Sequence, residues 1–164
     1  MMEHYSVLLQ ECLEGLHIRE DGIYVDATLG RGGHSAEILK RCPKGHLYAF
    51  DRDAQAIAQS LPRLRAAGTQ FTCIHSCFSA MQEKLAEHGV SAVDGILMDL
   101  GVSSPQFDEG ERGFSYRFDA PLDMRMDQGQ RLSAWHVINE YPFEDLCRIL
   151  KRYGEEPFAK QIAR

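Results

Sequence analysis

The stretch that decides the fold is Ile23-Tyr24-Val25-Asp26-Ala27-Thr28-Leu29-Gly30-Arg31-Gly32-Gly33. Residues 23–29 form a short apolar run, which is typical of a buried strand, and the glycines after it predict a tight turn. Residues 34–41 follow with helical spacing and end at a Pro-Lys-Gly turn. A second apolar run over 46–50 ends at Asp51, which completes a strand-helix-strand unit.

The same alternation continues along the chain to residue 101. We expect a helix from Asp53 to about residue 67, a third strand over 71–77, a helix capped by Ser79, and a fourth strand over 95–100. This order predicts an α/β fold with a parallel sheet and right-handed crossovers. Ligands of such sheets bind at the carboxyl ends of the strands, where the strand order reverses.

A different pattern follows residue 101. A long polar and aromatic loop extends to about residue 130, and helical segments are predicted near 134–140, 143–153 and 156–164, without a further strand. Four strands would leave the last one as an unpaired apolar edge, which folded proteins usually cover. We therefore expect the sheet to be incomplete here and the natural chain to continue past Arg164.

Composition places the chain among ordinary globular proteins, with 164 residues, 44% apolar and 26% charged. The amino terminus shows no basic stretch followed by an apolar run, and no segment approaches the roughly 18 apolar residues of a membrane span. A cytoplasmic protein with no membrane association is expected. Five cysteines without CxxC spacing argue against a disulfide framework or a zinc ribbon.

Two local clusters have more than one interpretation. Cys73, His75 and Cys77 alternate along a predicted strand, but no fourth ligand is apparent, so we expect no metal. The net charge of −6 argues against assuming a nucleic-acid partner. Basic groups are nevertheless concentrated in the long loop, where acidic residues are interleaved with them, so either RNA contact or a solvated mixed-charge loop is consistent with the pattern. These basic residues are Arg112, Arg117, Arg125 and Arg131.

The glycine turn and the acid after it indicate a nucleotide-like cofactor. Glycines 30, 32 and 33 permit close approach of a ligand, and the following helix offers free N–H groups, although a simple tight connection has the same appearance. Ser35 replaces the third glycine of a GxGxxG fingerprint. Asp51 lies about twenty residues later, where a carboxylate can accept hydrogen bonds from both hydroxyls of an adenosine ribose. A helix cap or a salt-bridge partner is the alternative role for Asp51.

Two further residues stand at predicted strand ends. Phe78, just beyond the third strand, is placed to pack on an adenine face, although a phenylalanine at a strand end is more often part of the ordinary core. Asp99 closes the fourth strand, where its carboxylate could face the ammonium of a methionine moiety or the reacting centre.

Four ordered motifs carry a family resemblance. They are residues 26–35 (DATLGRGGHS), 99–106 (DLGVSSPQ), 112–115 (RGFS) and 121–127 (PLDMRMD). Together with His4-x-x-Val7-Leu8-Leu9-x-Glu11 and the late Tyr-Gly-Glu-Glu at 153–156, they resemble the MraW-type small-subunit ribosomal RNA methyltransferase H family over essentially the whole chain. The resemblance implies a Rossmann-like fold that uses S-adenosylmethionine (AdoMet).

The resemblance also implies an activity and a set of contacts. It implies methyl transfer to the exocyclic N4 of a cytidine in 16S ribosomal RNA of the small subunit, in the bacterial cytoplasm. Carried over by motif, the cofactor contacts are Gly32, Gly33, His34, Asp51, Phe78, Asp99 and Gln106. Members of the family are about twice as long, with a helical domain inserted after the fourth strand. Residues 1–108 are then the AdoMet-binding half-domain, and residues 109–164 are the active-site loop and the beginning of the insertion.

The loop after the fourth strand carries the candidates for the chemistry. Ser103-Ser104-Pro105-Gln106 occupies the place where amino methyltransferases carry an Asp/Asn/Ser-Pro-Pro-aromatic loop, with Gln106 in place of the second proline. Ser103, Ser104 or a backbone carbonyl could hold the target amine, and neither a metal nor a covalent nucleophile is required. Aromatic residues of the loop could stack on an extruded base or simply pack within the loop. They are Phe107, Phe114, Tyr116 and Phe118.

Two other functions are compatible with parts of this pattern. A dinucleotide-dependent dehydrogenase shares the glycine turn and the distal acid, but it does not account for the Ser-Ser-Pro-Gln loop. A noncatalytic fragment that binds cofactor or partners without turnover is the third possibility. We expect that this polypeptide alone does not methylate small subunits.

Overall fold

The chain divides into two compact units, Met1–Gly101 and Val102–Arg164, and each is described by itself. The structure is a computed structural model that describes residues 6–164. His4, the first residue of the amino-terminal motif, lies outside the described residues. The sequence predicts a division after residue 108, whereas this division comes directly before the segment that carries Ser103 and Ser104.

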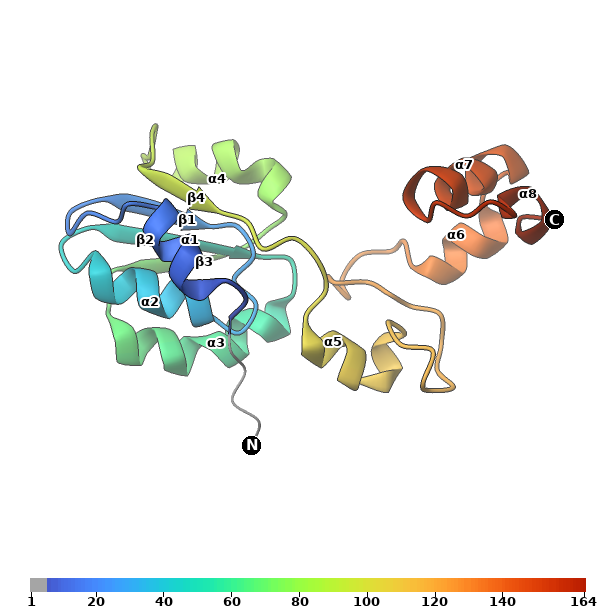
Figure 1. Cartoon of the computed structure of the whole chain (residues 1–164), viewed down its shortest axis with the longest axis horizontal. Coiled ribbons are helices and arrows are strands. Elements are labelled where there is room, and N and C mark those ends of the chain that lie inside the picture. Colours follow the sequence, from blue (N-terminus) through green and yellow to red (C-terminus); the bar gives the residue numbers. More distant parts are fainter. Residues whose placement is uncertain (1–5) are drawn as a thin grey trace. The chain divides into compact units, whose positions relative to one another are not determined.

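The first unit is a parallel sheet of four strands, β1 (Ile23–Asp26), β2 (His46–Asp51), β3 (Phe71–His75) and β4 (Gly95–Leu97). Their order is β3-β2-β1-β4, as Figure 1 shows. This is the order of the first four strands of a doubly wound Rossmann-like sheet, so the predicted α/β class is confirmed. The order reverses between β1 and β4, and Asp26 lies in register with Ala49 of β2 and Leu97 of β4.

Helices cover both faces of this sheet. Figure 1 shows α2 (Gly33–Arg41) and α3 (Ala54–Ala67) along one face and α4 (Met81–Glu87) along the other. Successive strand residues point to opposite faces. Tyr24 therefore joins the core under α2 and α3, whereas Val25 joins the core under α4. Helix α1 (Leu9–Gly15), which periodicity did not predict, adds Leu13 to the first of these cores.

Local chemistry explains where the elements begin and end. Asp53 caps α3, since its Oδ1 accepts the N–H groups of Gln55 at 2.9 Å and Ala56 at 3.4 Å. The expected cap at Ser79 is wrong. Residues Phe78–Ala80 form a 3₁₀ turn (η1), in which the N–H of Ala80 donates to the carbonyl of Cys77, and α4 begins only at Met81.

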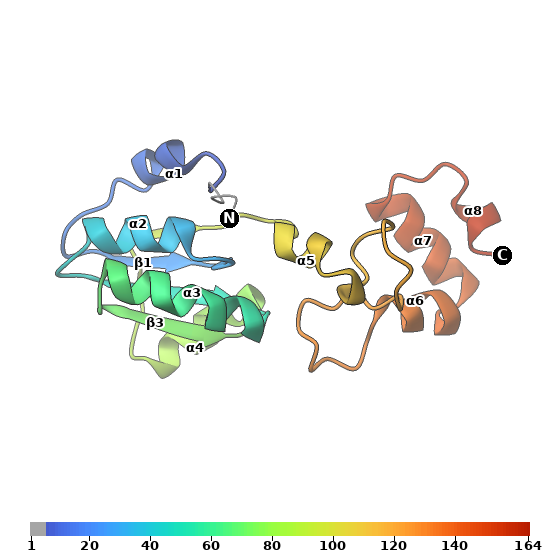
Figure 2. The same cartoon turned by 90° about the horizontal axis from the view of Figure 1, so that it is seen from below.

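The second unit is made of short helices around a long loop. They are α5 (Ser104–Asp108), η2 (Gly110–Arg112), α6 (Ala134–Glu140), α7 (Phe143–Tyr153) and α8 (Ala159–Ile162), visible from yellow to red in Figure 2. The bounds of α6 and α7 are those predicted, but α5 was expected to be loop. The last helix starts later than expected, because Glu156 first turns the chain by accepting the N–H of Phe158. Over residues 6–164, no helix is long and apolar enough to cross a membrane.

Candidate functional site

The glycine turn after β1 is bonded directly to the acid at the end of β2. The N–H of Gly30 donates to Oδ2 of Asp51 at 2.8 Å. The N–H of Leu29 donates to the carbonyl of Phe50 at 2.8 Å, so the main chain at the turn is also bonded to the main chain of β2. Because the strands are parallel, both groups lie at the carboxyl-terminal edge of the sheet. The two features that sequence spacing linked are therefore adjacent in space.

The turn needs glycine at two positions for different reasons. Gly30 and Gly32 have φ of +52° and +72°, values that strain other residues. Among the described residues, a Cβ on Gly30 would have only the carbonyl oxygen of Thr28 nearby, at 3.9 Å, so these residues leave the space beside it open. A Cβ on Gly32 would press against Ser60 at 3.1 Å and Leu64 at 3.3 Å. Gly32 thus lets the turn pack on α3, and the open side of the turn is at Gly30.

Asp51 is half-buried and held by main-chain donors on both oxygens. Its Oδ1 accepts the N–H of Asp53 at 2.8 Å, while Oδ2 takes the bond from Gly30. A carboxylate has about four acceptor positions, so two N–H donors leave capacity for a ligand. The alternative role as a helix cap belongs to its neighbour Asp53 instead. Asp51 therefore combines a fixed orientation with unused acceptor capacity.

A second carboxylate, which sequence reasoning did not single out, organises the same turn from inside. Asp26, at the end of β1, is 1% exposed. Its Oδ2 accepts the hydroxyl of Ser35 at 2.6 Å, and its Oδ1 accepts the N–H of Thr28 at 3.1 Å. Burial raises the pKa of the Asp26 carboxyl above its ordinary value, and the bond from Ser35 opposes that shift. A carboxylate inside an apolar strand needs such partners, which is the signal that could have identified it.

The end of β4 is tied to the same turn. The N–H of Asp99 donates to the hydroxyl oxygen of Thr28 at 2.7 Å. The side chain of Asp99 is exposed. Thr28 thus connects the buried carboxylate of Asp26 to the backbone at Asp99. The structure brings Asp99, the glycine turn and Asp51 to one edge of the sheet.

The other predicted cofactor contacts of the first unit are placed differently. His34 is buried, and its Nε2 lies 2.9 Å from the carbonyl oxygen of Val7, so its ring holds the amino-terminal segment. Gly33 begins α2, and a Cβ there would collide with the hydroxyl of Ser6. Phe78 opens η1 after β3 and is 38% exposed, which leaves part of its ring available to a ligand.

Ser103, Ser104 and Gln106 belong to the second unit and form the start of α5. Gln106 is buried, and its Oε1 accepts the N–H of Ser103 at 3.0 Å. This bond satisfies a free donor at the helix start and explains why α5 forms. Gln106 therefore has a local structural role, in addition to the cofactor contact that the family resemblance implies for it.

The four arginines of the loop divide into two kinds. Arg112 is buried, and its guanidinium donates to the carbonyls of Arg125 and Met126, both at 3.1 Å. Arg125 pairs with both oxygens of Asp123, at 2.7 and 2.8 Å. The Arg125 bond lowers the pKa of the Asp123 carboxyl. These two arginines hold the loop together, whereas Arg117 and Arg131 are exposed.

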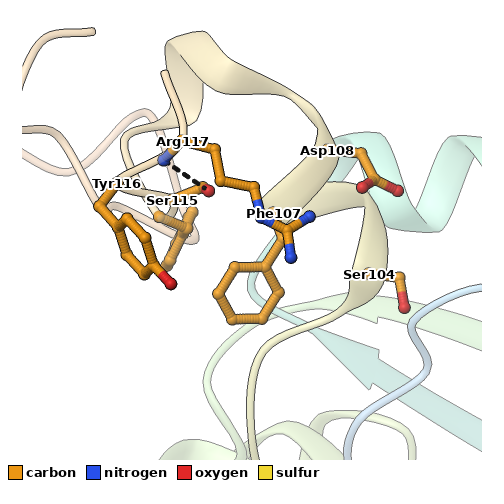
Figure 3. A pocket seen from close by; sticks show the side chains of 7 residues that line it. Ser104, Phe107, Asp108, Ser115, Tyr116 and Arg117 are labelled. Carbon is orange, nitrogen blue, oxygen red and sulfur yellow. Dashed lines mark hydrogen bonds between the residues drawn. The ribbon is translucent and has the colours of Figure 1, made fainter. Parts of the chain in front are cut away.

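A pocket of about 340 Å³ lies within the second unit, between α5 and the loop that follows η2. Figure 3 shows Ser104, Phe107 and Asp108 on α5, and Ser115, Tyr116 and Arg117 on the facing loop. Phe114 completes the lining. Of the aromatic residues considered for base stacking, only Phe118 is outside it, and it packs against Gly110.

The cysteine and histidine trio forms no metal centre in the part of the chain that the structure describes. Within residues 6–164, no group of three or more His, Cys, Asp or Glu side chains is arranged to hold a metal ion. β3 ends at His75, so Cys77 lies beyond the strand. The Nε2 of His75 lies 2.9 Å from the carbonyl oxygen of Arg52.

Comparison with known proteins places these features in a family. The model of the MraW methylase family matches residues 1–164. The ribosomal RNA small subunit methyltransferase H of Exiguobacterium sibiricum is 60% identical over 164 residues, which are 100% of this chain and 53% of that protein. The protein of the same name from Limosilactobacillus fermentum is 56% identical over 98% of this chain and 52% of its own length. The chain spans about half the length of the curated relatives it matches.

A solved structure is also similar. An rRNA methylase from Streptococcus thermophilus is 25% identical, with a TM-score of 0.41, over 51% of this chain and 49% of that one.

Proposed function

This chain belongs to the MraW methylase family, and we propose that it binds AdoMet for the methylation of small-subunit ribosomal RNA. One observation carries the proposal. The N–H of Gly30 and the carboxylate of Asp51 meet at 2.8 Å, beside open space, at the edge of the sheet where such folds bind ligands.

The residues at this edge fit the parts of AdoMet. Asp51 retains acceptor capacity for the two hydroxyls of the ribose. Phe78, partly exposed after β3, offers a ring face to the adenine. The exposed carboxylate of Asp99 is suited to the ammonium of the methionine portion. Gly32, Gly33 and His34 would contribute main-chain groups at the start of α2, because the His34 ring is engaged with Val7.

The sulfonium of AdoMet supplies an already activated methyl group. The residues of this chain would have to orient that group toward its acceptor and exclude water. We assign the acceptor side to the loop after β4, where Ser103 and Ser104 are the candidates to hold the target amine, and Gln106 to a contact with the cofactor. In this division most of the residues proposed to hold AdoMet belong to the first unit, and the second unit begins the RNA-binding part of the molecule.

The family and the names of the relatives support the proposed substrate. Relatives at 60% and 56% identity are named ribosomal RNA small subunit methyltransferase H. The motifs of the Ser-Ser-Pro-Gln loop support an exocyclic amine as the acceptor, and we propose the N4 of a cytidine in 16S ribosomal RNA, in the bacterial cytoplasm. The proposal for the chain itself is cofactor binding. Because the relatives are about twice as long, we expect no N4-methylcytidine when this chain alone is incubated with small subunits and AdoMet.

Calorimetry tests the cofactor assignment against the dehydrogenase alternative. The chain should release or absorb heat with AdoMet and with its demethylated product, S-adenosylhomocysteine, but not with NAD. The matched control for the variant Asp51→Ala is Asp21→Ala. It removes an exposed carboxylate just before β1, at the opposite end of that strand, and should leave the affinity unchanged. Binding of NAD without binding of AdoMet would overturn the proposal.

A further inference from the structure

The segment Ser6–Leu8 lies against the first turn of α2, beside the proposed cofactor contacts of residues 32–34. The Nε2 of His34 is 2.9 Å from the carbonyl oxygen of Val7. Because a carbonyl oxygen only accepts, Nε2 carries the proton and donates this hydrogen bond. The His34 side chain is buried, which shields the bond from water. A segment that belongs to no helix or strand is thus fixed to the site by a side chain of α2.

Gly33 admits this segment because it has no side chain. A Cβ on Gly33 would collide with the hydroxyl of Ser6 and would lie 3.4 Å from the Cβ of Ser6. A Cβ projects outward from a helix, whereas the free N–H groups of the first turn point along the axis. Ser6 therefore flanks the start of α2 and does not stand in line with its N–H groups. This is the position of a wall beside a bound ligand, not of a plug in its place.

Leu8 has a main-chain conformation that leucine rarely adopts. Its φ of +47° and ψ of +37° lie in the left-handed region. The chain is held on both sides of this residue. Val7 is bonded to His34, and the carbonyl of Leu8 accepts the N–H of Cys12 at 2.9 Å where α1 begins. Backbone strain of this kind occurs at ligand clamps, where the surrounding structure maintains it.

The segment has a fixed base and exposed apolar side chains. Leu13 of α1 is buried in the core under α2 and α3, and Leu9 packs against that core, so α1 is anchored. Val7 and Leu8 are 57% and 63% exposed. Figure 2 shows the dark blue chain entering α1 near the edge of the sheet toward which the arrow of β1 points. Two apolar side chains are therefore available at the carboxyl-terminal edge to exclude water from a ligand.

We propose that Ser6–Leu8 is a strap that covers the methionine portion of bound AdoMet and slows its release, and that His34 is the positioning residue that holds this strap. The inference rests on the proposed function, in which the start of α2 receives that portion of the cofactor. The strap forms a wall beside it, and Val7 and Leu8 shield it from water. The His34 ring acts on the cofactor through Val7, in addition to the main-chain contact assigned above.

The dissociation rate of S-adenosylhomocysteine from the full 164-residue chain, measured by surface plasmon resonance, tests this inference. His34→Leu removes the donor to Val7 and should raise the rate about fivefold, the equivalent of one hydrogen bond. His34→Gln supplies an amide N–H in place of the ring Nε2 and should restore the rate of the unchanged chain. The association rate should be the same in all three proteins.

A change at Leu8 tests the strap without altering His34. Leu8→Ile keeps the apolar atoms but adds a branch at Cβ, which disfavours the left-handed conformation, and should raise the dissociation rate by a similar factor. The matched control is Leu132→Ile, at an exposed leucine of the second unit that is not in the left-handed conformation, and it should leave the rate unchanged. Methylthioadenosine, which lacks the amino-acid portion, should dissociate from every variant at one rate.

Several outcomes would overturn the inference. They are equal dissociation rates in His34→Leu and His34→Gln, an unchanged rate in Leu8→Ile, and faster release of methylthioadenosine, which indicates general damage to the site. Faster association at an unchanged dissociation rate would also overturn it, because the segment would then be a plug. If the unchanged chain binds neither AdoMet nor S-adenosylhomocysteine, the proposed function fails and the strap with it. If it binds both and the variants release them at its own rate, only the strap fails.

Discussion

Removal of one buried hydroxyl should test whether Asp26 organises the glycine turn. In Ser35→Ala, the 2.6 Å bond to Oδ2 of Asp26 is lost. Asp26 retains the bond that its Oδ1 accepts from the N–H of Thr28. Both side chains are almost fully buried, so water cannot replace the hydroxyl. A hydrogen bond contributes about 1 kcal/mol between neutral groups and about 1.5–3 kcal/mol when one group is charged, and we therefore expect the sheet to lose about 1–3 kcal/mol, with the larger loss when Asp26 is ionised.

The loss should depend on pH in a defined direction. Burial raises the pKa of Asp26 in the folded chain, so its contribution to stability is greatest below about pH 4 and declines as the pH rises through the folded pKa. Without Ser35 that pKa rises further, which extends the decline to higher pH. When Asp26 is protonated, the missing bond is a neutral one, with a contribution of about 1 kcal/mol. The effect of Ser35→Ala should therefore shrink as the pH is lowered through the folded pKa of Asp26.

Amide hydrogen exchange in β1 and β2 measures this effect, because protection there reports opening of the sheet. Ser60→Ala is the matched control. Ser60 is also fully buried, but its hydroxyl donates to the neutral carbonyl of Ile57 at 2.8 Å, so its loss should be about 1 kcal/mol or less at every pH. A loss below about 0.5 kcal/mol in Ser35→Ala, or one that does not grow as the pH rises through the folded pKa of Asp26, would refute the role of Asp26.

Three further predictions concern other parts of the chain. Asp51→Ala should weaken AdoMet binding by about 1.5–3 kcal/mol in calorimetry, and unchanged affinity would exclude the ribose role. Asp53→Ala should lower the exchange protection of α3 by about 1 kcal/mol, since it removes the cap, and full protection would contradict the capping assignment. The bond from Arg125 lowers the pKa of Asp123. The contribution of this ion pair to the stability of the second unit should therefore be present above about pH 4 and lost as the pH falls through the folded pKa of Asp123. Fluorescence of Trp135, the only tryptophan, should report this acid transition, and Asp123→Asn should flatten it.

Periodicity predicted the sheet well because β1 and β2 are buried on both faces. Runs such as residues 23–29 and 46–50 are mostly apolar, and turn residues separate them from the helices. The predicted ends were less accurate, since the expected strands over 71–77 and 95–100 stop at His75 and Leu97. After β4, the apolar residues Met98 and Leu100 continue past the last paired residue, so composition alone does not show where pairing ends.

The sequence spacing between the glycine turn and Asp51 predicted that these two groups lie together, but it did not predict the buried contacts of Asp26 beneath the turn. The distance from the turn to Asp51 follows from a strand-helix-strand unit of ordinary length, which is why sequence spacing could predict their proximity. The role of Asp26 depends on Ser35 pointing back from the first turn of α2, a contact that no periodicity encodes. Likewise, four arginines in one loop look alike in sequence. Only the fold separates Arg112, which is bonded to carbonyls, from the exposed Arg117.

Asp26 and Asp51 end neighbouring strands, and together they explain why the turn is ready for a ligand. Each accepts a main-chain N–H of the turn, from Thr28 and Gly30 respectively, so the turn is held from its buried side and from its open side. The charge of Asp51 also contributes to raising the pKa of Asp26, as expected for two carboxylates on adjacent strands. Because Asp51 is already oriented by two N–H donors, it loses little side-chain freedom when a ligand arrives. Its bonds to ribose hydroxyls can then contribute most of their free energy to affinity.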